Sequence, residues 1–164
     1  VSIHSLVDTD FFPAFIRYMR TNAELTKQVV FEFSQDIVQS CGVLEEESLS
    51  ALADAGFSFS LDNVLNLDID YRALAERNFK YIKIDSEILL YGMREAGAPV
   101  RTEDMVDFLK RHDIQLIAEK VESERAVLGL AKAGVTLGQG YLFSRPRLVR
   151  QEVFVGADDL LRRA

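Results

Sequence analysis

The chain has 164 residues, and a hydrophobic content of 48% lets it bury one sizeable core, which predicts a single domain over residues 1–164. A net charge of −7 with scattered basic residues disfavours duplex nucleic acid and an anionic membrane as partners. One cysteine excludes an internal disulfide framework and fits a cytoplasmic domain, and no apolar run is long enough to cross a membrane, so any membrane tether would lie outside this chain.

The first predicted element is a strand over Val1–Leu6, which opens the chain without an initiator Met. We therefore expect the chain to be part of a larger protein. A second strand is predicted at Val29–Ser34.

A junction recurs four times along the rest of the chain: the end of an amphipathic helix, a turn residue and then a short strand. The turn residues are Gly56, Asn78, Asp113 and Gly134, and the strands after them cover 57–61, 79–84, 114–118 and 135–137. Gly and Asn suit a left-handed helix C-cap, and Asp is an ordinary loop former. Helices that alternate with strands in this way predict a parallel sheet with helical crossovers.

Helices are predicted where apolar residues recur at helical spacing after a capping candidate. The apolar stripes are Phe11, Phe15, Ile16 and Met19; Leu49, Leu52 and Ala53; Ile88, Leu89 and Met93; Met105, Val106 and Leu109; and Ala126, Val127 and Leu130. We expect most of these side chains to belong to the core.

Six strands in this order could form an open doubly wound sheet or most of a barrel. Alternation along five strands delivers a polar group near the C-terminal end of one face, namely Glu32, Asp62, Lys83, Glu119 and Gln139. Helices on both faces would make these groups costly to bury, whereas in a barrel they point into the mouth, where active sites lie. The barrel is therefore favoured, and because a full barrel takes about 250 residues, we expect about two strands to lie outside this chain.

These five polar residues are the kind of set that a metal-dependent phosphodiesterase needs. Carboxylates hold hard divalent cations such as Mg²⁺, and a Lys can stabilise or activate an attacking water. Taken singly, each residue is more often an ion-pair partner or a helix cap, so composition alone does not establish the function.

Three segments closely resemble successive signatures of EAL domains, the family of cyclic-di-GMP phosphodiesterases. Tyr81–Asp85, Ile117–Glu122 and Gln139–Pro146 stand where that family reads YLKID, IAEGVE and QGYLFSRP. Three further segments also match, namely Phe31–Gln35 with the LEITE strand, Leu61–Asn63 with the aspartate pair of the DDFGTG loop, and Val1–Phe12 with the segment of the metal-binding Asn. The resemblance covers nearly the whole chain and implies an α/β fold, an EAL-type (β/α) TIM-like barrel that lacks its first strands here.

The resemblance also implies a role for each matching residue. Glu32 and Asp62 stand at metal ligands, Lys83 at the residue near the catalytic water, and Glu119 at another acidic site residue. Gln139 would contact the site from the last strand, and Pro146 would lie beside a guanine pocket. The residues expected to bind the ligand are Asp62, Glu119, Gln139 and Pro146.

Departures from the family pattern indicate that catalysis is lost. The EAL motif itself, with a metal-ligand Glu and a nearby Arg, is absent from the chain. His4 stands where the family has its Asn, and Asn63 replaces the second aspartate, which removes a negative charge that would hold a second cation. The loop from Val64 to Asp70 has no glycine, so it cannot take a positive φ cheaply. We therefore expect vestigial catalytic residues at Lys83 and Glu119, vestigial metal ligands at Glu32 and Asp62, and weak or no binding of Mg²⁺.

Three functions are compatible with this pattern. The favoured one is a catalytically inactive regulatory domain that binds cyclic-di-GMP as a signal receptor. The second is a protein-interaction scaffold with a vestigial pocket, as in flagellar or polar regulation, whose loop residues Val64, Leu65 and Leu67 plug the pocket, face a partner or pack on a helix. The third is a surviving phosphodiesterase that uses His4 as a substitute ligand.

The strand predicted at Val1–Leu6 would form an unpaired sheet edge, which invites pairing with another chain. We therefore expect a homodimer or another protein partner, or else a disordered N-terminal segment.

Overall fold

The computed structural model describes residues 3–64, 66, 69–92 and 101–147, and of residues 3 and 4 it describes the backbone alone. In this part of the chain, five parallel strands form one sheet in the order β1-β2-β3-β4-β5. Their bounds are β1 (Val30–Ser34), β2 (Ser58–Asp62), β3 (Phe79–Asp85), β4 (Gln115–Glu119) and β5 (Leu137–Gly138). The predicted parallel α/β sheet is confirmed, with a last strand of two residues.

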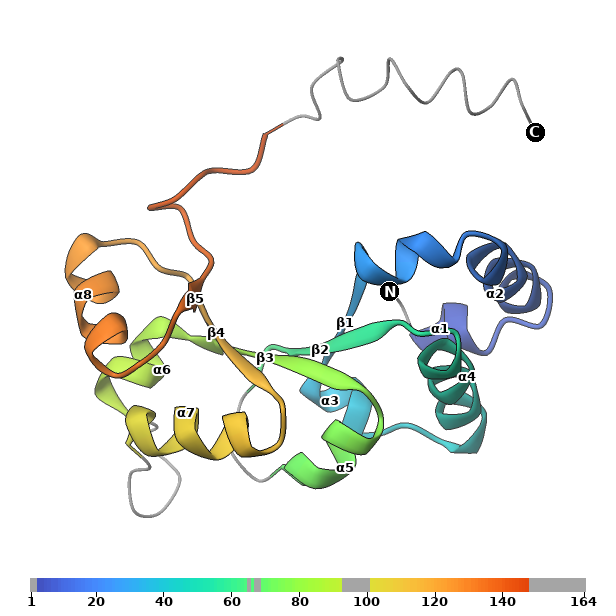
Figure 1. The fold of residues 1–164 in the computed structure, drawn as a ribbon, viewed down its shortest axis with the longest axis horizontal. Coiled ribbons are helices and arrows are strands. Elements are labelled where there is room, and N and C mark those ends of the chain that lie inside the picture. The colour runs from blue at the N-terminus through green and yellow to red at the C-terminus, as the bar shows by residue number, and fades with distance from the viewer. Residues whose placement is uncertain (1–2, 65, 67–68, 93–100, 148–164) are drawn as a thin grey trace.

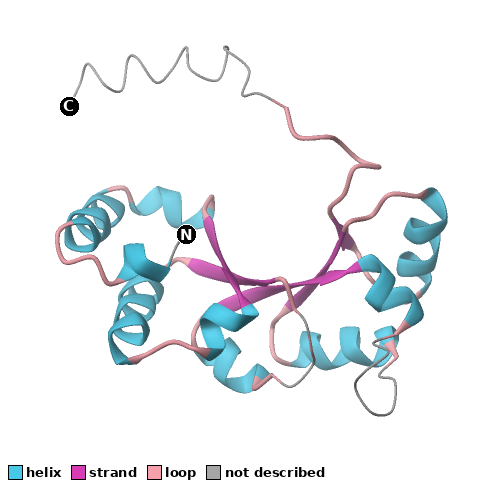
Figure 2. Ribbon diagram, turned by 180° about the vertical axis from the view of Figure 1, so that it is seen from behind, coloured by secondary structure: helices cyan, strands magenta, loops and turns pink. Residues whose placement is uncertain are grey.

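The helices are placed by the crossovers between successive strands. Their bounds are α1 (Ile3–Leu6), α2 (Phe11–Thr21), α3 (Gln35–Gln39), α4 (Val43–Asp54), α5 (Tyr71–Glu76), α6 (Ser86–Tyr91), α7 (Thr102–Arg111) and α8 (Glu124–Lys132), with a 3-10 turn η1 (Ala23–Lys27) before β1. Helices α3, α5 and α7 lie on one side of the sheet (Figure 1), and the sheet curves away from them (Figure 2). None of the described helices is long and apolar enough to cross a membrane.

The four predicted helix-to-strand junctions are confirmed by their backbone conformation. Gly56, Asn78, Asp113 and Gly134 have φ values of 94°, 65°, 57° and 81°. Glycine takes this left-handed conformation without a steric cost, and Asn and Asp tolerate it better than other side chains. Asn78 adds a specific contact, since its Nδ2 donates to the carbonyl of Phe57 at 2.6 Å. Each junction thus reverses the chain from a helix into the next strand.

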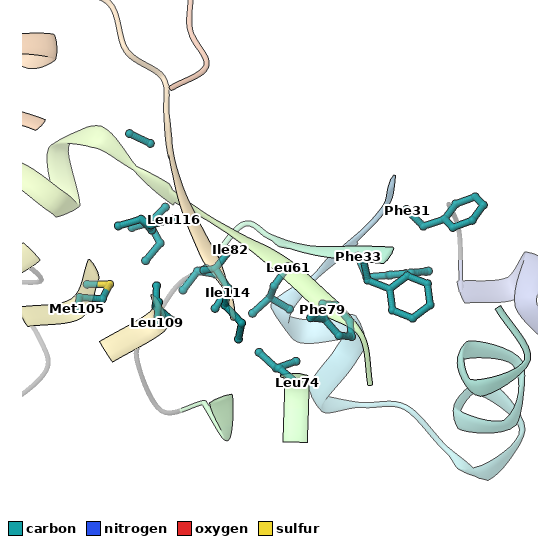
Figure 3. Close-up of a cluster of buried hydrophobic side chains, with 14 of the residues drawn as sticks. Phe31, Phe33, Leu61, Leu74, Phe79, Ile82, Met105, Leu109, Ile114 and Leu116 are labelled. Atoms are coloured by element: carbon teal, nitrogen blue, oxygen red, sulfur yellow. The ribbon is translucent and has the colours of Figure 1, made fainter. Parts of the chain in front are cut away.

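An aromatic layer forms the core between the sheet and the helices. Phe59 is fully buried, and its ring centroid lies 5.7 Å from that of Phe33 and 5.3 Å from that of Phe79, both in edge-to-face contact. Figure 3 shows how strand side chains meet side chains of α5 and α7, and it labels Leu61, Phe79, Ile82, Leu74, Met105 and Leu109. The predicted apolar stripes supply most of the helical side of this core, while Met93 lies outside the described residues.

The strand predicted at Val1–Leu6 is wrong, because residues 3–6 form helix α1. Leu6 is only 2% exposed, and its carbonyl accepts a hydrogen bond of 2.6 Å from Ser48 Oγ on α4. A short apolar run has no periodicity that distinguishes a strand from a buried helical turn. Here the packing against α4 favours the helix. The dimer was predicted from an unpaired strand edge at this segment, so that support is removed and the dimer stays a prediction.

We predict that Phe59→Ala lowers the free energy of unfolding by about 3–5 kcal/mol, because it removes a fully buried ring from between two others. Phe11→Ala is the matched control, since that ring is 49% exposed, and its cost should stay below about 1 kcal/mol. Chemical denaturation followed by circular dichroism measures both. Equal costs for the two variants would contradict the described core.

Candidate functional site

Four charged side chains meet at the C-terminal edge of the sheet. Glu32, Asp62, Lys83 and Glu119 come from β1, β2, β3 and β4 in that order. The Lys83 side chain is only 7% exposed, its Nζ contacts Glu32 Oε1, and it lies 3.8 Å from Glu119 Oε1. Parallel strands bring these ends together because every crossover returns the chain in the same direction. The structure thus joins four of the predicted site residues in one cluster.

Glu119 and Asp62 share a carboxyl–carboxylate contact within this cluster. Burial raises the pKa of Glu119, the negative charge of Asp62 raises it further, and a hydrogen bond between the two carboxyl groups adds to the effect. The neighbouring Lys83 ammonium acts in the opposite direction and does not cancel the increase. A raised pKa at Glu119 means that the pair holds a proton more readily than a solvated glutamate does.

The donor set of the cluster does not fit a metal centre as it stands. Lys83 engages Glu32 and Glu119, and Asp62 Oδ1 accepts a hydrogen bond of 2.8 Å from the backbone N–H of Asn63. Within the described residues, no three His, Cys, Asp or Glu side chains gather in a way that could hold a metal ion. The side chain of His4 lies outside the described residues, so its predicted position at the site is untested. The weak or absent binding of Mg²⁺ stays a prediction.

A cavity of about 330 Å³ lies beside this cluster, at the low end of the range of about 300–1,000 Å³ for small-molecule sites. It is lined by Glu119, Lys120, Glu122, Gln139, Gly140 and Tyr141. The backbone of Gln139 fixes one wall, because its N–H donates to Ala118 at 2.8 Å and its carbonyl accepts from Val121 at 3.0 Å. Pro146, which was predicted beside a guanine pocket, is exposed and is not among the lining residues.

Gly140 allows the cavity wall to approach β4 closely. A Cβ atom at this position would lie 2.1 Å from the carbonyl oxygen of Val121, a distance that no side chain can take. The glycine after Gln139 is therefore required by the close backbone contact.

Gln35 anchors the loop that follows β2, a role that the sequence analysis did not assign to it. It is 2% exposed, directly follows β1, and its Nε2 donates to the carbonyl oxygen of Asn66 at 3.1 Å and to its Oδ1 at 3.0 Å. Its Oε1 accepts from the Asn66 N–H at 3.3 Å. Val64 of the same loop is 3% exposed and belongs to the core, while Leu65 and Leu67 lie outside the described residues. The sequence signals for this anchor were a polar residue immediately after a strand and its match to the last position of the LEITE segment.

Lys120 is the second missed residue, and it has a strained backbone. Its φ is 52°, which costs a residue with a Cβ about 1–2 kcal/mol. Its Nζ pairs with Asp85 Oδ2 at 2.8 Å, and exposed pairs of this kind return about 0.2–1 kcal/mol. Burial alone would raise the pKa of Asp85, but the bonds from Lys120 and from the Glu87 N–H lower it below its usual value. The ion pair therefore does not compensate for the conformation of Lys120.

We predict that Gln35→Ala lowers the free energy of unfolding by about 1–3 kcal/mol, because it removes the hydrogen bonds by which the buried Gln35 side chain holds the loop at Asn66. Gln115→Ala removes an exposed glutamine of β4 and serves as the control with little effect. In the Gln35→Ala background, the additional substitution Asn66→Ala should lower the free energy of unfolding only slightly further. If chemical denaturation showed that the effects of the two substitutions simply add, the contact between Gln35 and Asn66 would be contradicted.

We predict that the contribution of Glu119 to stability depends on pH. Since its pKa is raised in the folded state, the stabilising effect is complete below the ordinary pKa of Glu and is lost as the pH rises through the folded value. The free energy of unfolding of wild type minus that of Glu119→Gln should thus fall as the pH rises from below the ordinary pKa of Glu through the raised pKa of Glu119. Denaturation at several pH values measures this difference, and parallel curves for the two proteins would contradict it.

Comparisons with known proteins identify the family of the chain. The family described as "EAL domain" matches residues 1–146. "Probable cyclic di-GMP phosphodiesterase PdeI" of Escherichia coli (strain K12) is 27% identical over 146 residues, which cover 89% of this chain and 18% of that protein. Cyclic di-GMP phosphodiesterase CdgJ of Vibrio cholerae is 29% identical over 128 residues, which cover 76% of this chain and 27% of that protein. The chain thus spans less than a third of the length of these curated relatives.

Solved structures show the same fold. The EAL domain of Mycobacterium smegmatis DcpA superposes with a TM-score of 0.71 at 24% identity, covering 96% of this chain and 70% of that one. The PaMucR phosphodiesterase in complex with c-di-GMP gives a TM-score of 0.72 at 16% identity, and the match covers 93% of this chain and 68% of that one. The EAL enzyme Bd1971 with cAMP and cyclic-di-GMP bound gives a TM-score of 0.69 at 24% identity, and the match covers 96% of this chain and 41% of that one. Together with the match over residues 1–146, these similarities place the chain in the EAL domain family.

Proposed function

We propose that this chain is a catalytically inactive EAL domain that binds cyclic-di-GMP as a signal receptor. The observation that carries the proposal is Asn63, whose neutral amide directly follows Asp62 at the end of β2, where the family has its second metal-binding carboxylate. Two structurally similar proteins, PaMucR and Bd1971, are described with cyclic-di-GMP bound, which supports this dinucleotide as the ligand.

The loss of hydrolysis follows from the state of the carboxylates. A two-metal phosphodiester hydrolysis needs oxygen ligands that are free to coordinate both cations and to activate a water. Here Glu32 is paired with Lys83, and Asp62 is bonded to Glu119 and to the Asn63 N–H. Asn63 offers a neutral amide at the position where the family has a second carboxylate, which further weakens any second cation site. These features support binding without turnover.

The cavity beside the cluster has the parts needed to recognise a nucleotide base. Gln139 carries an amide that can donate and accept hydrogen bonds, and Tyr141 has a side chain that is 61% exposed. The Arg145 guanidinium lies 5.9 Å from the Tyr141 ring centroid. Aromatic and guanidinium planes stack on purines in many nucleotide sites. This end of the site can therefore hold one guanine of the dinucleotide.

A protein-interaction scaffold is the alternative, and exposed apolar side chains favour it. On α4, Val43 is 76% exposed and Leu44 is 64% exposed, and on α2 Tyr18 is 61% exposed. Such side chains are common at contact surfaces between proteins. This alternative predicts a folded domain that does not bind the dinucleotide.

We predict saturable binding of cyclic-di-GMP in a calorimetric titration, with the nucleotide recovered uncut by chromatography after long incubation with Mg²⁺ or Mn²⁺. Gln139→Ala should weaken binding by about tenfold, since it removes polar contacts to the base. Gln115→Ala on β4 is the matched control and should bind like wild type.

The other outcomes separate the competing functions. Recovery of a linear dinucleotide would contradict the loss of catalysis and favour a surviving phosphodiesterase. No heat and no thermal shift from a folded protein would contradict the receptor and favour the scaffold.

A further inference from the structure

The end of β4 carries a lysine where the backbone calls for a glycine. Lys120 has a φ of 52°, and its neighbours fix it there, because Val121 N–H donates to Gln139 and the Lys120 carbonyl accepts from Ser86 Oγ at 3.1 Å. Glycine would take this conformation without strain, and the EAL pattern quoted above has glycine at this position. The backbone at this position therefore gives no reason for a lysine side chain.

The position of Lys120 in the cavity suggests a reason. Its side chain is 71% exposed, so its ammonium can reach a ligand without a large desolvation cost. The other charged residues that line the cavity, Glu119 and Glu122, are acidic and would repel a phosphate. Lys83, by contrast, is buried and committed to Glu32 and Glu119. Lys120 is thus the cation of this cavity that is placed to meet an anionic ligand.

We propose that Lys120 binds a phosphodiester group of the nucleotide and takes over the charge compensation that a divalent cation would otherwise give. This inference rests on the proposed function. On binding, the ammonium turns from Asp85 towards the phosphate in the cavity that Lys120 lines. Charge-assisted hydrogen bonds to phosphate are among the stronger polar contacts, so they offset a strained backbone. Binding is accordingly independent of Mg²⁺.

The test compares cyclic-di-GMP binding by wild type, Lys120→Gly and Lys120→Arg in calorimetric titrations with EDTA present. Lys120→Gly should weaken binding by about tenfold while its stability in chemical denaturation stays equal or rises, because strain is relieved. Lys120→Arg keeps the charge and should stay within about threefold of wild type. Lys80→Gln is the matched control, since Lys80 pairs with Asp113 at the opposite end of the sheet. It should bind like wild type.

Each result decides the question. Weaker binding by Lys120→Gly without a loss of stability supports the phosphate contact, because a purely structural ion pair with Asp85 predicts a loss of stability and unchanged binding. Wild-type affinity in Lys120→Gly would overturn this inference alone. A requirement of the wild type for Mg²⁺ would also overturn it, whereas no binding by the wild type at all would overturn the proposed receptor function together with it.

Discussion

The buried ammonium of Lys83 is the constraint on which the site depends. A charge that is 7% exposed is unfavourable in a protein interior unless carboxylates compensate for it. Those carboxylates come from β1 and β4, which are separated by β2 and β3 in the sheet, so the ion-pair network spans most of the described sheet. Because these strands are parallel, their C-terminal ends meet at one edge and bring Glu32 and Glu119 to the same nitrogen.

The ion pairs of Lys83 also give the charged cluster and the neighbouring cavity different binding properties. Carboxylates that hold an ammonium and a neighbouring N–H have less capacity to coordinate a cation, so polar recognition shifts towards the cavity between β4 and the segment after β5. The groups that line it include the amide of Gln139, the ring of Tyr141 and the ammonium of Lys120, which pairs with Asp85. Such groups can bind a nucleotide through hydrogen bonds, stacking and charge, and this supports the receptor proposed above.

Structural features that depend on neighbouring residues were predicted from the sequence, whereas features that depend on contacts between distant residues were not. The four junctions were predictable because a turn residue after an amphipathic helix is a local signal, and each of the four has a left-handed backbone. The polar edge was predictable because alternation along a strand fixes the face of each side chain. The helix at Ile3–Leu6 was not, since tertiary packing against α4 overrides a short apolar run. The anchor between Gln35 and Asn66 joins residues 31 positions apart, and no local pattern encodes it.

The residues with a strained backbone differ between the two ends of the sheet. Among the described residues, four that are not glycine have a positive φ: Asn63, Asn78, Asp113 and Lys120. Asn78 and Asp113 precede strands, at the end away from the site, where short polar side chains reduce the cost. Asn63 and Lys120 follow strands, at the site edge, and lysine has no such compensation. Backbone strain is concentrated at functional sites in many proteins, so the conformation of Lys120 at this edge supports the proposal that its side chain meets the ligand.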